Sequence, residues 1–229
     1  MRSRFPRWLA GTAVARHVLH FEARIEESIA AFAASLPPGS RVLDAGAGEA
    51  VHARYFSGKR YVAVDLGVGD PEWDYRRLDA IANLTALPFR ADSFDACLNI
   101  VTLEHIPEPL QALLEIARVL RPGGRLLIAV PHQWEIHQAP HDYFRFTRYG
   151  IGRLLEQAGF TAVRIDPAGG FFRMLARRAL NAMRYFPAPL WPLAAILFLP
   201  AGLLLPALDF LDRDRDFTLG YICSAEKQS

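Results

Sequence analysis

The sequence predicts an α/β fold: a doubly wound, mostly parallel sheet of seven strands with an antiparallel last strand. Three observations lead to this prediction. Apolar strand-like segments alternate with helical ones between residues 41 and 166, which is typical of right-handed βαβ units. A Gly-x-Gly turn follows the first strand, at the edge where open α/β sheets bind ligands. Residues 125–130 are almost all apolar, as in a strand covered on both faces.

The individual elements follow from local patterns. Strands are expected at residues 41–45, 61–65, 77–79, 94–101, 125–130, 161–165 and 217–225. Helices are expected at residues 8–35, 50–57, 109–120 and 148–158, the last of them closed by Gly159. Residues 121–124 (Arg-Pro-Gly-Gly) are expected to form a turn, because proline stops a helix and glycine permits positive φ.

Length, composition and charge describe a folded, cytoplasmic protein. The chain has 229 residues, 52% hydrophobic and 22% charged, which is enough for one α/β domain with a full core. Its formal net charge of +2 is too small to indicate a nucleic-acid partner. Cys97 and Cys223 lie in apolar strand-like runs, so we expect buried free thiols and no requirement for an oxidising compartment.

The amino-terminal residues have two interpretations. Arg2, Arg4 and Arg7 have the charge of a secretory signal, but the apolar stretch 8–15 is short and ends at Arg16. The apolar spacing then continues at helical intervals. We therefore expect residues 8–35 to form an amphipathic helix over the ligand-binding side of the sheet.

The turn after the first strand carries the most specific motif, Asp44-Ala45-Gly46-Ala47-Gly48. Two glycines let the backbone approach a ligand closely. A dinucleotide site would need a third small residue at position 51, which is Val51. A phosphate-binding P-loop would need a Gly-Lys-Ser/Thr sequence, which does not follow. Asp65 ends the second strand, where a carboxylate can accept the hydroxyls of a ribose.

This motif, with the segments 87–95 (LPFRADSFD), 101–107 (VTLEHIP) and 121–124, resembles the class I S-adenosylmethionine-dependent methyltransferases of Rossmann-like fold, in particular the methyltransferase type 11 branch. The resemblance covers roughly residues 36–166, and residues 217–225 match the family's final strand. It departs from the family at Ala50, where a third glycine is common. The resemblance implies S-adenosyl-L-methionine as the cofactor, with Asp44 near its amino group, Gly46 and Gly48 beside its methionine and ribose, and Asp79 and Ala80 at its adenine.

Catalysis of methyl transfer needs alignment of the acceptor, and a general base only where the acceptor carries a proton. His105 and His141 are the candidate bases. His132, Asp142, Tyr143 and Arg145 are expected to line the acceptor pocket, although Asp142 and Arg145 also suit a structural pair. No metal is expected, because the spacing of His132, His137 and His141 needs a helix that Pro140 disfavours.

Residues 167–216 interrupt the strand pattern, and residues 185–208 contain no charge and five prolines. A single membrane crossing would place residues 217–225 beyond reach of the sheet. We therefore expect a broken apolar hairpin at the membrane interface, with a lid or a homodimer contact as the alternatives. The domain limits expected are 1–36 for a helical segment, 37–166 with 217–229 for the sheet domain, and 167–216 for the apolar insertion.

The resulting functional hypothesis is methyl transfer from S-adenosylmethionine to a small, lipophilic acceptor. The enzyme would be cytoplasmic, with peripheral contact to the inner face of the membrane through residues 185–208. A non-catalytic, membrane-associated S-adenosylmethionine-binding module is the alternative. A nicotinamide-dependent oxidoreductase is a third hypothesis, which Val51 disfavours because a dinucleotide site needs a small residue there.

Overall fold

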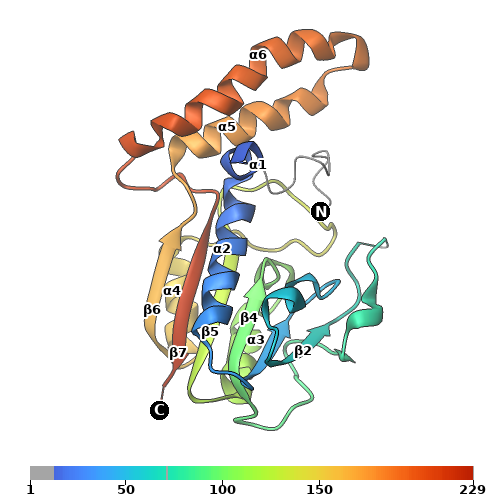
Figure 1. Cartoon of the computed structure of the whole chain (residues 1–229), viewed down its shortest axis with the longest axis vertical. Coiled ribbons are helices and arrows are strands. Elements are labelled where there is room, and N and C mark those ends of the chain that lie inside the picture. Colours follow the sequence, from blue (N-terminus) through green and yellow to red (C-terminus); the bar gives the residue numbers. More distant parts are fainter. Residues whose placement is uncertain (1–12, 71, 229) are drawn as a thin grey trace. The chain divides into compact units, whose positions relative to one another are not determined.

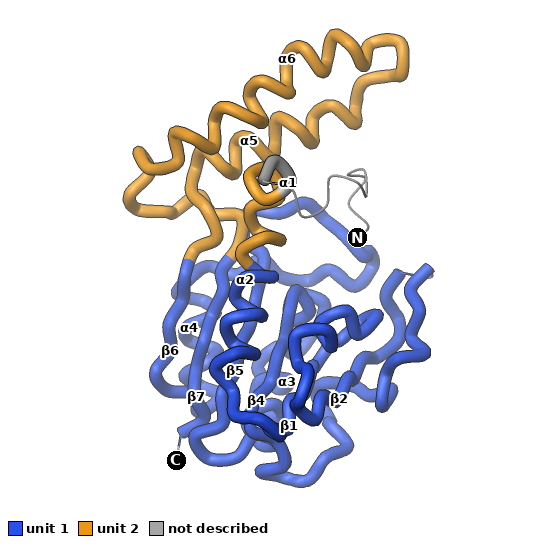
Figure 2. The backbone as a smooth tube through the Cα atoms, in the orientation of Figure 1, with its two compact units in different colours: residues 1, 25–166, 221–229 blue, residues 2–24, 167–220 orange. Residues whose placement is uncertain are grey.

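The computed structural model describes residues 13–70 and 72–228, with side chains from residue 16 onward. The chain divides into two compact units (Figure 2). Unit 1 contains residues 25–166 and the last strand from Tyr221, and unit 2 contains residues 167–220 with the chain up to Arg24. The boundary of the amino-terminal segment thus falls inside a helix. The domain limits given above remain a prediction.

Unit 1 is built on a seven-stranded sheet with the order β3-β2-β1-β4-β5-β7-β6 (Figure 1). The strands are β1 (Arg41–Ala45), β2 (Arg60–Asp65), β3 (Ala80–Ile81), β4 (Phe94–Ile100), β5 (Leu120–Pro131), β6 (Phe160–Pro167) and β7 (Gly220–Lys227). Strands β1 to β5 pair in parallel. The amide of Gln228 donates to the oxygen of Gly159, and that of Ala168 donates to Gly220, so β7 runs antiparallel to β6. The predicted fold class is confirmed.

Helices cover both faces of the sheet in unit 1 (Figure 1). The helices α3 (Pro109–Val119) and α4 (Arg148–Gln157) pack on one face, and α2 (His20–Ser35) covers the other. Their apolar stripes are buried, with Ile29 from α2 and Leu113 and Leu155 from the other two at 0% exposure. The core strands are buried on both faces, which explains their nearly continuous apolar sequence.

Three predicted elements near the amino-terminal end of the sheet domain are wrong in detail. The single helix expected at residues 8–35 is two helices, α1 (Ala13–Val18) and α2, and residues 8–12 lie outside the described chain. The helix expected at residues 50–57 is a short 3-10 helix (Val51–Tyr55), preceded by Ala50 in the left-handed conformation at φ 54°. The third strand, expected at residues 77–79, lies at Ala80–Ile81, and Arg77 belongs instead to a 3-10 turn over Tyr75–Arg77 that Asp74 caps.

The turn expected at residues 121–124 is also wrong, since these residues belong to the start of β5. The register between β4 and β5 shifts between Phe94 and Ala96. Pro122 has no amide hydrogen to give to a ladder, and Gly123 adopts a φ of 70°, both of which an irregular strand start tolerates. The Pro-Gly-Gly sequence therefore marks a bulge instead of a break between elements.

Unit 2 is helical and contains α1, α5 (Phe171–Ala182), α6 (Trp191–Leu204) and the 3-10 helix η7 (Leu205–Leu211). Helices α5 and α6 lie side by side, and Gly202 permits this because a Cβ there would lie 2.5 Å from Leu180. Asp209 is buried and accepts hydrogen bonds from the amides of Gly170 and Arg173 at the start of α5. Unit 2 thus has its own packing and polar contacts.

The apolar stretch of unit 2 is less broken than predicted. Pro192 occupies the first turn of α6, where its missing amide costs nothing, and Pro200 lies inside the helix. Among the described residues, one helical segment, Ala188–Leu211, has the length and composition to cross a membrane. Length and composition alone are weak evidence of a crossing.

Candidate functional site

The turn leaving β1 is shaped by its glycines. Gly46 and Gly48 have φ values of 91° and 53°. The amides of Gly46 and Ala47 both donate to the oxygen of Val64 in β2, at 2.8 and 3.0 Å. A Cβ on Gly46 would lie 2.2 Å from the Thr102 Cγ2, directly after β4. Only glycine therefore allows the turn to pass this close to the end of β4.

Asp65 joins this turn to the loop after β2. Its Oδ2 accepts the amide of Gly48 at 2.9 Å, and its Oδ1 accepts the amide of Gly67 at 2.8 Å. A carboxylate has about four acceptor sites, so each oxygen can still accept another hydrogen bond. The carboxylate predicted to hold a ribose therefore also organises the two loops at the edge of the sheet.

Asp44 is fully buried at the end of β1. Its Oδ2 accepts the hydroxyl of Tyr61 and lies 3.1 Å from the Nδ1 of His52. Burial, together with the charge of Asp44, raises the pKa of Tyr61, so the hydroxyl stays a donor. The Oδ1 of Asp44 and the Oδ1 of Asn99 are buried and have no hydrogen-bond partner among the described residues. Both oxygens therefore retain unused acceptor capacity.

The other two predicted cofactor residues lie at the edge of the sheet. The exposed Asp79 accepts the amide of Ala63 through its Oδ2 at 2.8 Å and donates its own amide to the oxygen of Ala63 at 2.9 Å. Ala80 pairs with Val64 in the short strand β3. The structure thus places Asp44 and Asp65 near the carboxyl ends of the neighbouring strands β1 and β2, whereas Asp79 directly precedes β3.

Two side chains that the sequence did not predict at the site lie beside the glycine turn. The ring of Trp73 lies 3.2 Å from the position of a Cβ on Gly48, and it packs edge-on against Tyr75. The hydroxyl of Thr102 donates to the oxygen of Gly46 at 3.2 Å. The loop after β2 has no periodic pattern, so its aromatic residues could not be placed beside the turn in advance.

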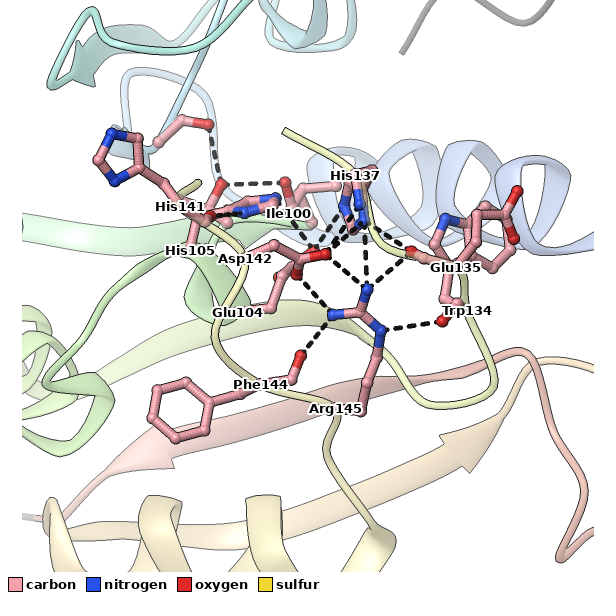
Figure 3. A network of polar contacts seen from close by, with 12 residues as sticks. Ile100, Glu104, His105, Trp134, Glu135, His137, His141, Asp142, Phe144 and Arg145 are labelled. Atoms are coloured by element: carbon pink, nitrogen blue, oxygen red, sulfur yellow. Dashed lines mark hydrogen bonds and ion pairs between the residues drawn. The ribbon is translucent and has the colours of Figure 1, made fainter. Parts of the chain in front are cut away.

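A second polar cluster lies on the segments that follow β4 and β5 (Figure 3). Its centre is Glu104, whose side chain is 0% exposed and whose two carboxylate oxygens have no hydrogen-bond partner among the described residues. The Nε2 atoms of His105 and His137 each lie 3.6 Å from Glu104 Oε1. Both Nε2 atoms are buried and likewise without a hydrogen-bond partner.

Arg145 and Asp142 form a structural pair beside this cluster (Figure 3). The guanidinium donates to both oxygens of Asp142, at 2.6 and 2.7 Å, and also to the backbone oxygens of Trp134, Glu135 and Phe144. Although burial opposes ionisation, the hydrogen bonds from Arg145 hold the pKa of Asp142 at about 2. The pair folds the loop between β5 and α4.

The same loop raises the pKa of His137. Burial lowers this pKa, but the carboxylate of Glu104, the backbone oxygen of Glu135 and the charge of Asp142 outweigh burial. The Asp142 Oδ2 also accepts the amide of His137 at 2.8 Å. His137 was considered in the sequence only with His132 and His141, so its pairing with Glu104 was missed.

The remaining predicted pocket residues do not gather in one place. The ring of His132 contacts the oxygen of Phe146 at 2.8 Å and packs against Tyr221, which gives it a structural role in the core. His141 is exposed, and its ring contacts the Tyr143 hydroxyl at 3.1 Å. The structure therefore brings His105 together with His137 and Glu104, and leaves His132 apart from them.

The family comparison covers the glycine turn and the Glu104–His105 segment, but not the loop after β5. Residues 43–128 match the family model described as a methyltransferase domain. The demethylmenaquinone methyltransferase of Renibacterium salmoninarum is 41% identical over 98 residues, which are 40% of this chain and 41% of that protein. The protein of the same name from Mycobacterium tuberculosis is 42% identical over 95 residues, with the same coverage. The chain thus spans about two fifths of the length of these curated relatives.

Solved structures match over a longer range. A putative methyltransferase in complex with the activator Trm112 of Haloferax volcanii superposes with a TM-score of 0.60 at 20% identity, covering 94% of each chain. The cyclase SpnF superposes with a TM-score of 0.59 at 21% identity, covering 90% of this chain and 81% of that one. Likeness at such identities shows the fold alone, and one fold supports more than one reaction.

Proposed function

We propose that this chain, which carries a class I methyltransferase domain, transfers the methyl group of S-adenosylmethionine to a small, lipophilic acceptor. The observation that carries the proposal is the connection between the Gly46–Gly48 turn and Asp65, which keeps two carboxylate oxygens beside this turn. A phosphate-binding turn would instead present amides to an anion. Here the nearby ionisable groups Asp44, Asp65 and Asp79 are acidic.

The residues present fit this cofactor. Asp44 Oδ1 is a buried, unpaired carboxylate oxygen suited to an ammonium group, and Asp65 retains acceptor sites for two ribose hydroxyls. Asp79 keeps one carboxylate oxygen for an adenine amino group. When bound, S-adenosylmethionine supplies a methyl group already activated by its sulfonium. The chain then has to align the acceptor and keep water away.

A quinone-like acceptor is the best-supported class. The curated relatives described above are named demethylmenaquinone methyltransferases. A hydroxylated ring would lose a proton during transfer, which calls for an accessible base. His141 meets this need best, since its ring is exposed, whereas the His105 Nε2 is buried against Glu104.

Calorimetric titration with S-adenosylmethionine and with S-adenosylhomocysteine tests the cofactor proposal. Incubation with cofactor labelled in its methyl group and a membrane lipid extract then tests transfer. We expect label in an organic-soluble product, and much less label with Asp65→Ala. Asp166→Ala is the matched control, because Asp166 is a carboxylate of the same unit that pairs with Arg164 on the surface. Absence of cofactor binding in the wild-type protein would refute the proposal.

We also propose that unit 2 meets a membrane surface. Helix α6 and η7 expose a large set of apolar side chains: Trp191, Leu193, Ile196, Leu197, Leu199, Leu203, Leu204, Leu208, Phe210 and Leu211. An apolar surface of this extent on a soluble protein marks an interaction site. Arg184 and Tyr185 precede it and suit the headgroup level. Flotation with vesicles should recover the wild type, and Leu197→Glu with Leu204→Glu should abolish recovery.

The same experiments separate the alternative functions. Vesicle flotation and cofactor binding without transfer to any extract component would favour a non-catalytic binding module. A concentration-dependent dimer that the two glutamate substitutions dissociate, without flotation, would instead assign the apolar surface to a second copy of the chain.

A further inference from the structure

We propose that Glu104, His105 and His137 form a binding site for a divalent zinc ion. The three residues come from two segments, the 3-10 turn after β4 (Leu103–His105) and the loop after β5. One carboxylate and two imidazoles are a ligand set that suits zinc and its neighbours in the first transition series. The set leaves further coordination positions open for water or a substrate oxygen.

The geometry is close to that of a coordinated ion. The potential ligand atoms of the three residues lie within 4.8 Å of one another, and both imidazole Nε2 atoms lie 3.6 Å from Glu104 Oε1. Ligand atoms bound to zinc at about 2.0–2.1 Å in a tetrahedral arrangement stand roughly 3.3 Å apart. A shift of a few tenths of an ångström therefore brings each imidazole to its ligand distance from the carboxylate.

The hydrogen bonds of the two imidazoles determine which of their nitrogens carry hydrogen and which face the carboxylate of Glu104. The His105 Nδ1 lies 2.5 Å from the oxygen of His141, and the His137 Nδ1 lies 3.2 Å from the oxygen of Glu135. A carbonyl oxygen only accepts, so each Nδ1 that bonds to one carries the hydrogen. At His137 the Arg145 Nη2, a donor, lies 3.5 Å from the same Nδ1, farther away than the oxygen of Glu135. In a neutral ring the Nε2 then presents a lone pair, and both lone pairs point toward the carboxylate of Glu104. Such a group needs a positive charge between its members, either a metal ion or a proton.

The groups that hydrogen-bond the proposed ligands are of the kind found around the ligands of known metal sites. A histidine that binds a metal through one nitrogen usually donates its other N–H to a backbone carbonyl or a carboxylate. His105 and His137 both do so, and Asp142 lies 3.5 Å from the Nδ1 of His137. Arg145 fixes Asp142 in turn. The rings are thereby oriented before any ion binds.

A proton shared between Glu104 and an imidazole is the competing occupant. It would require an Nε2–H···O hydrogen bond of about 2.7–3.2 Å, whereas both separations are 3.6 Å. The separations favour a larger cation over a proton. Binding of the ion does not rest on the proposed function.

The test is metal binding to tag-free full-length protein. Titration calorimetry with zinc chloride after chelator treatment should show one site, and cobalt substitution should give the intense visible bands of four- or five-coordinate Co²⁺. Glu104→Gln and His137→Asn should each weaken zinc affinity by about 100-fold or more. His141→Asn is the matched control and should bind zinc as the wild type does, because only the backbone oxygen of His141 contacts the cluster. Circular dichroism checks that each variant is folded.

Two results would overturn the proposal. One is the absence of zinc binding in the folded wild type, as expected if a proton occupies the cluster. The other is zinc binding that persists in both Glu104→Gln and His137→Asn, which would place the ion elsewhere. Parallel titration with S-adenosylmethionine separates the hypotheses, since cofactor binding without zinc binding refutes the metal site alone.

Discussion

The carboxylate of Asp65 accepts the backbone amide of Gly48 at 2.9 Å, and this contact joins the ends of β1 and β2. The same side chain accepts the amide of Gly67, so one residue sets the shape of both loops. Sites on the crevice beyond the strand ends depend on such loops being held in one arrangement. The affinity for S-adenosylmethionine should therefore depend on Asp65 both directly and through the Gly48 turn.

Substitution of Asp65 should weaken cofactor binding strongly. Hydrogen bonds to a charged group contribute about 1.5–3 kcal/mol each, so loss of the carboxylate in Asp65→Ala should reduce affinity by roughly 100-fold or more. Asp65→Asn should be intermediate, because its amide nitrogen cannot accept an N–H. Calorimetry at a temperature where each variant is folded provides the measurement. Wild-type affinity in Asp65→Ala would show that the cofactor binds elsewhere.

Gly46→Ala should be much more harmful than an alanine at another glycine of positive φ. The new Cβ would lie 2.2 Å from Thr102 Cγ2, so Thr102 or the turn must move. Backbone strain and overpacking together should lower the free energy of unfolding by about 3 kcal/mol. Gly58 has a φ of 75° with nothing within 4 Å of its Cβ position, and Gly58→Ala should cost about 1 kcal/mol.

Urea denaturation of the two glycine variants supplies these values. Equal losses in both would mean that the turn can move away from Thr102 without cost, and that close approach is not the reason for glycine at this position.

The two cysteines should be unreactive in the folded protein. Cys97 and Cys223 are free and buried, and burial raises the pKa of Cys97 and brings that of Cys223 to about 12. Because the thiolate is the nucleophile, alkylation with iodoacetamide at pH 8 should be negligible in buffer and complete in denaturant. Mass spectrometry counts the adducts. Rapid labelling of either thiol in buffer would contradict the burial described for β4 or β7.

Unit 2 should lose stability as the pH falls from about 6.5 to about 4. Burial, then the charges of Arg173 and Arg24, lower the pKa of His20 to about 4. The unfolded chain takes up a proton on this ring at a higher pH than the folded chain, so acid favours unfolding. At pH 5 this proton uptake should lower the free energy of unfolding by about 1 kcal/mol, a value halved because the ring is partly exposed.

Thermal unfolding at pH 7 and pH 5 measures this loss. His20→Gln removes the titrating ring and should show a smaller difference between the two pH values. A wild-type protein whose midpoint is the same at both pH values would contradict the buried, neutral state of His20.

Much of the fold was predictable because its signals are local. The apolar run of β5, the helical spacing of α3 and the position of Gly46 in a strand-to-loop turn are each properties of one segment. The carboxylates Asp44 and Asp65 could be placed for the same reason, since Asp65 ends β2 and Asp44 is the last residue but one of β1.

The remaining features depend on contacts between distant segments. Glu104 and His137 meet because the loop after β5 folds back on itself through the Asp142–Arg145 pair. The sequence suggests that pair, but nothing local to Glu104 or His137 indicates that these two side chains meet. Trp73 lies beside Gly48 because of an aperiodic loop. The bulge at Pro122 was mistaken for a turn, since proline and glycine mark both.

Titration of the wild-type protein and of Asp65→Ala with S-adenosylmethionine tests the central claim most directly. The account predicts one saturable site in the wild type and at least a 100-fold weaker one in the variant, with Asp166→Ala unchanged. A folded wild-type protein that takes up no S-adenosylmethionine at millimolar concentration, or one whose affinity is the same in all three forms, would contradict it.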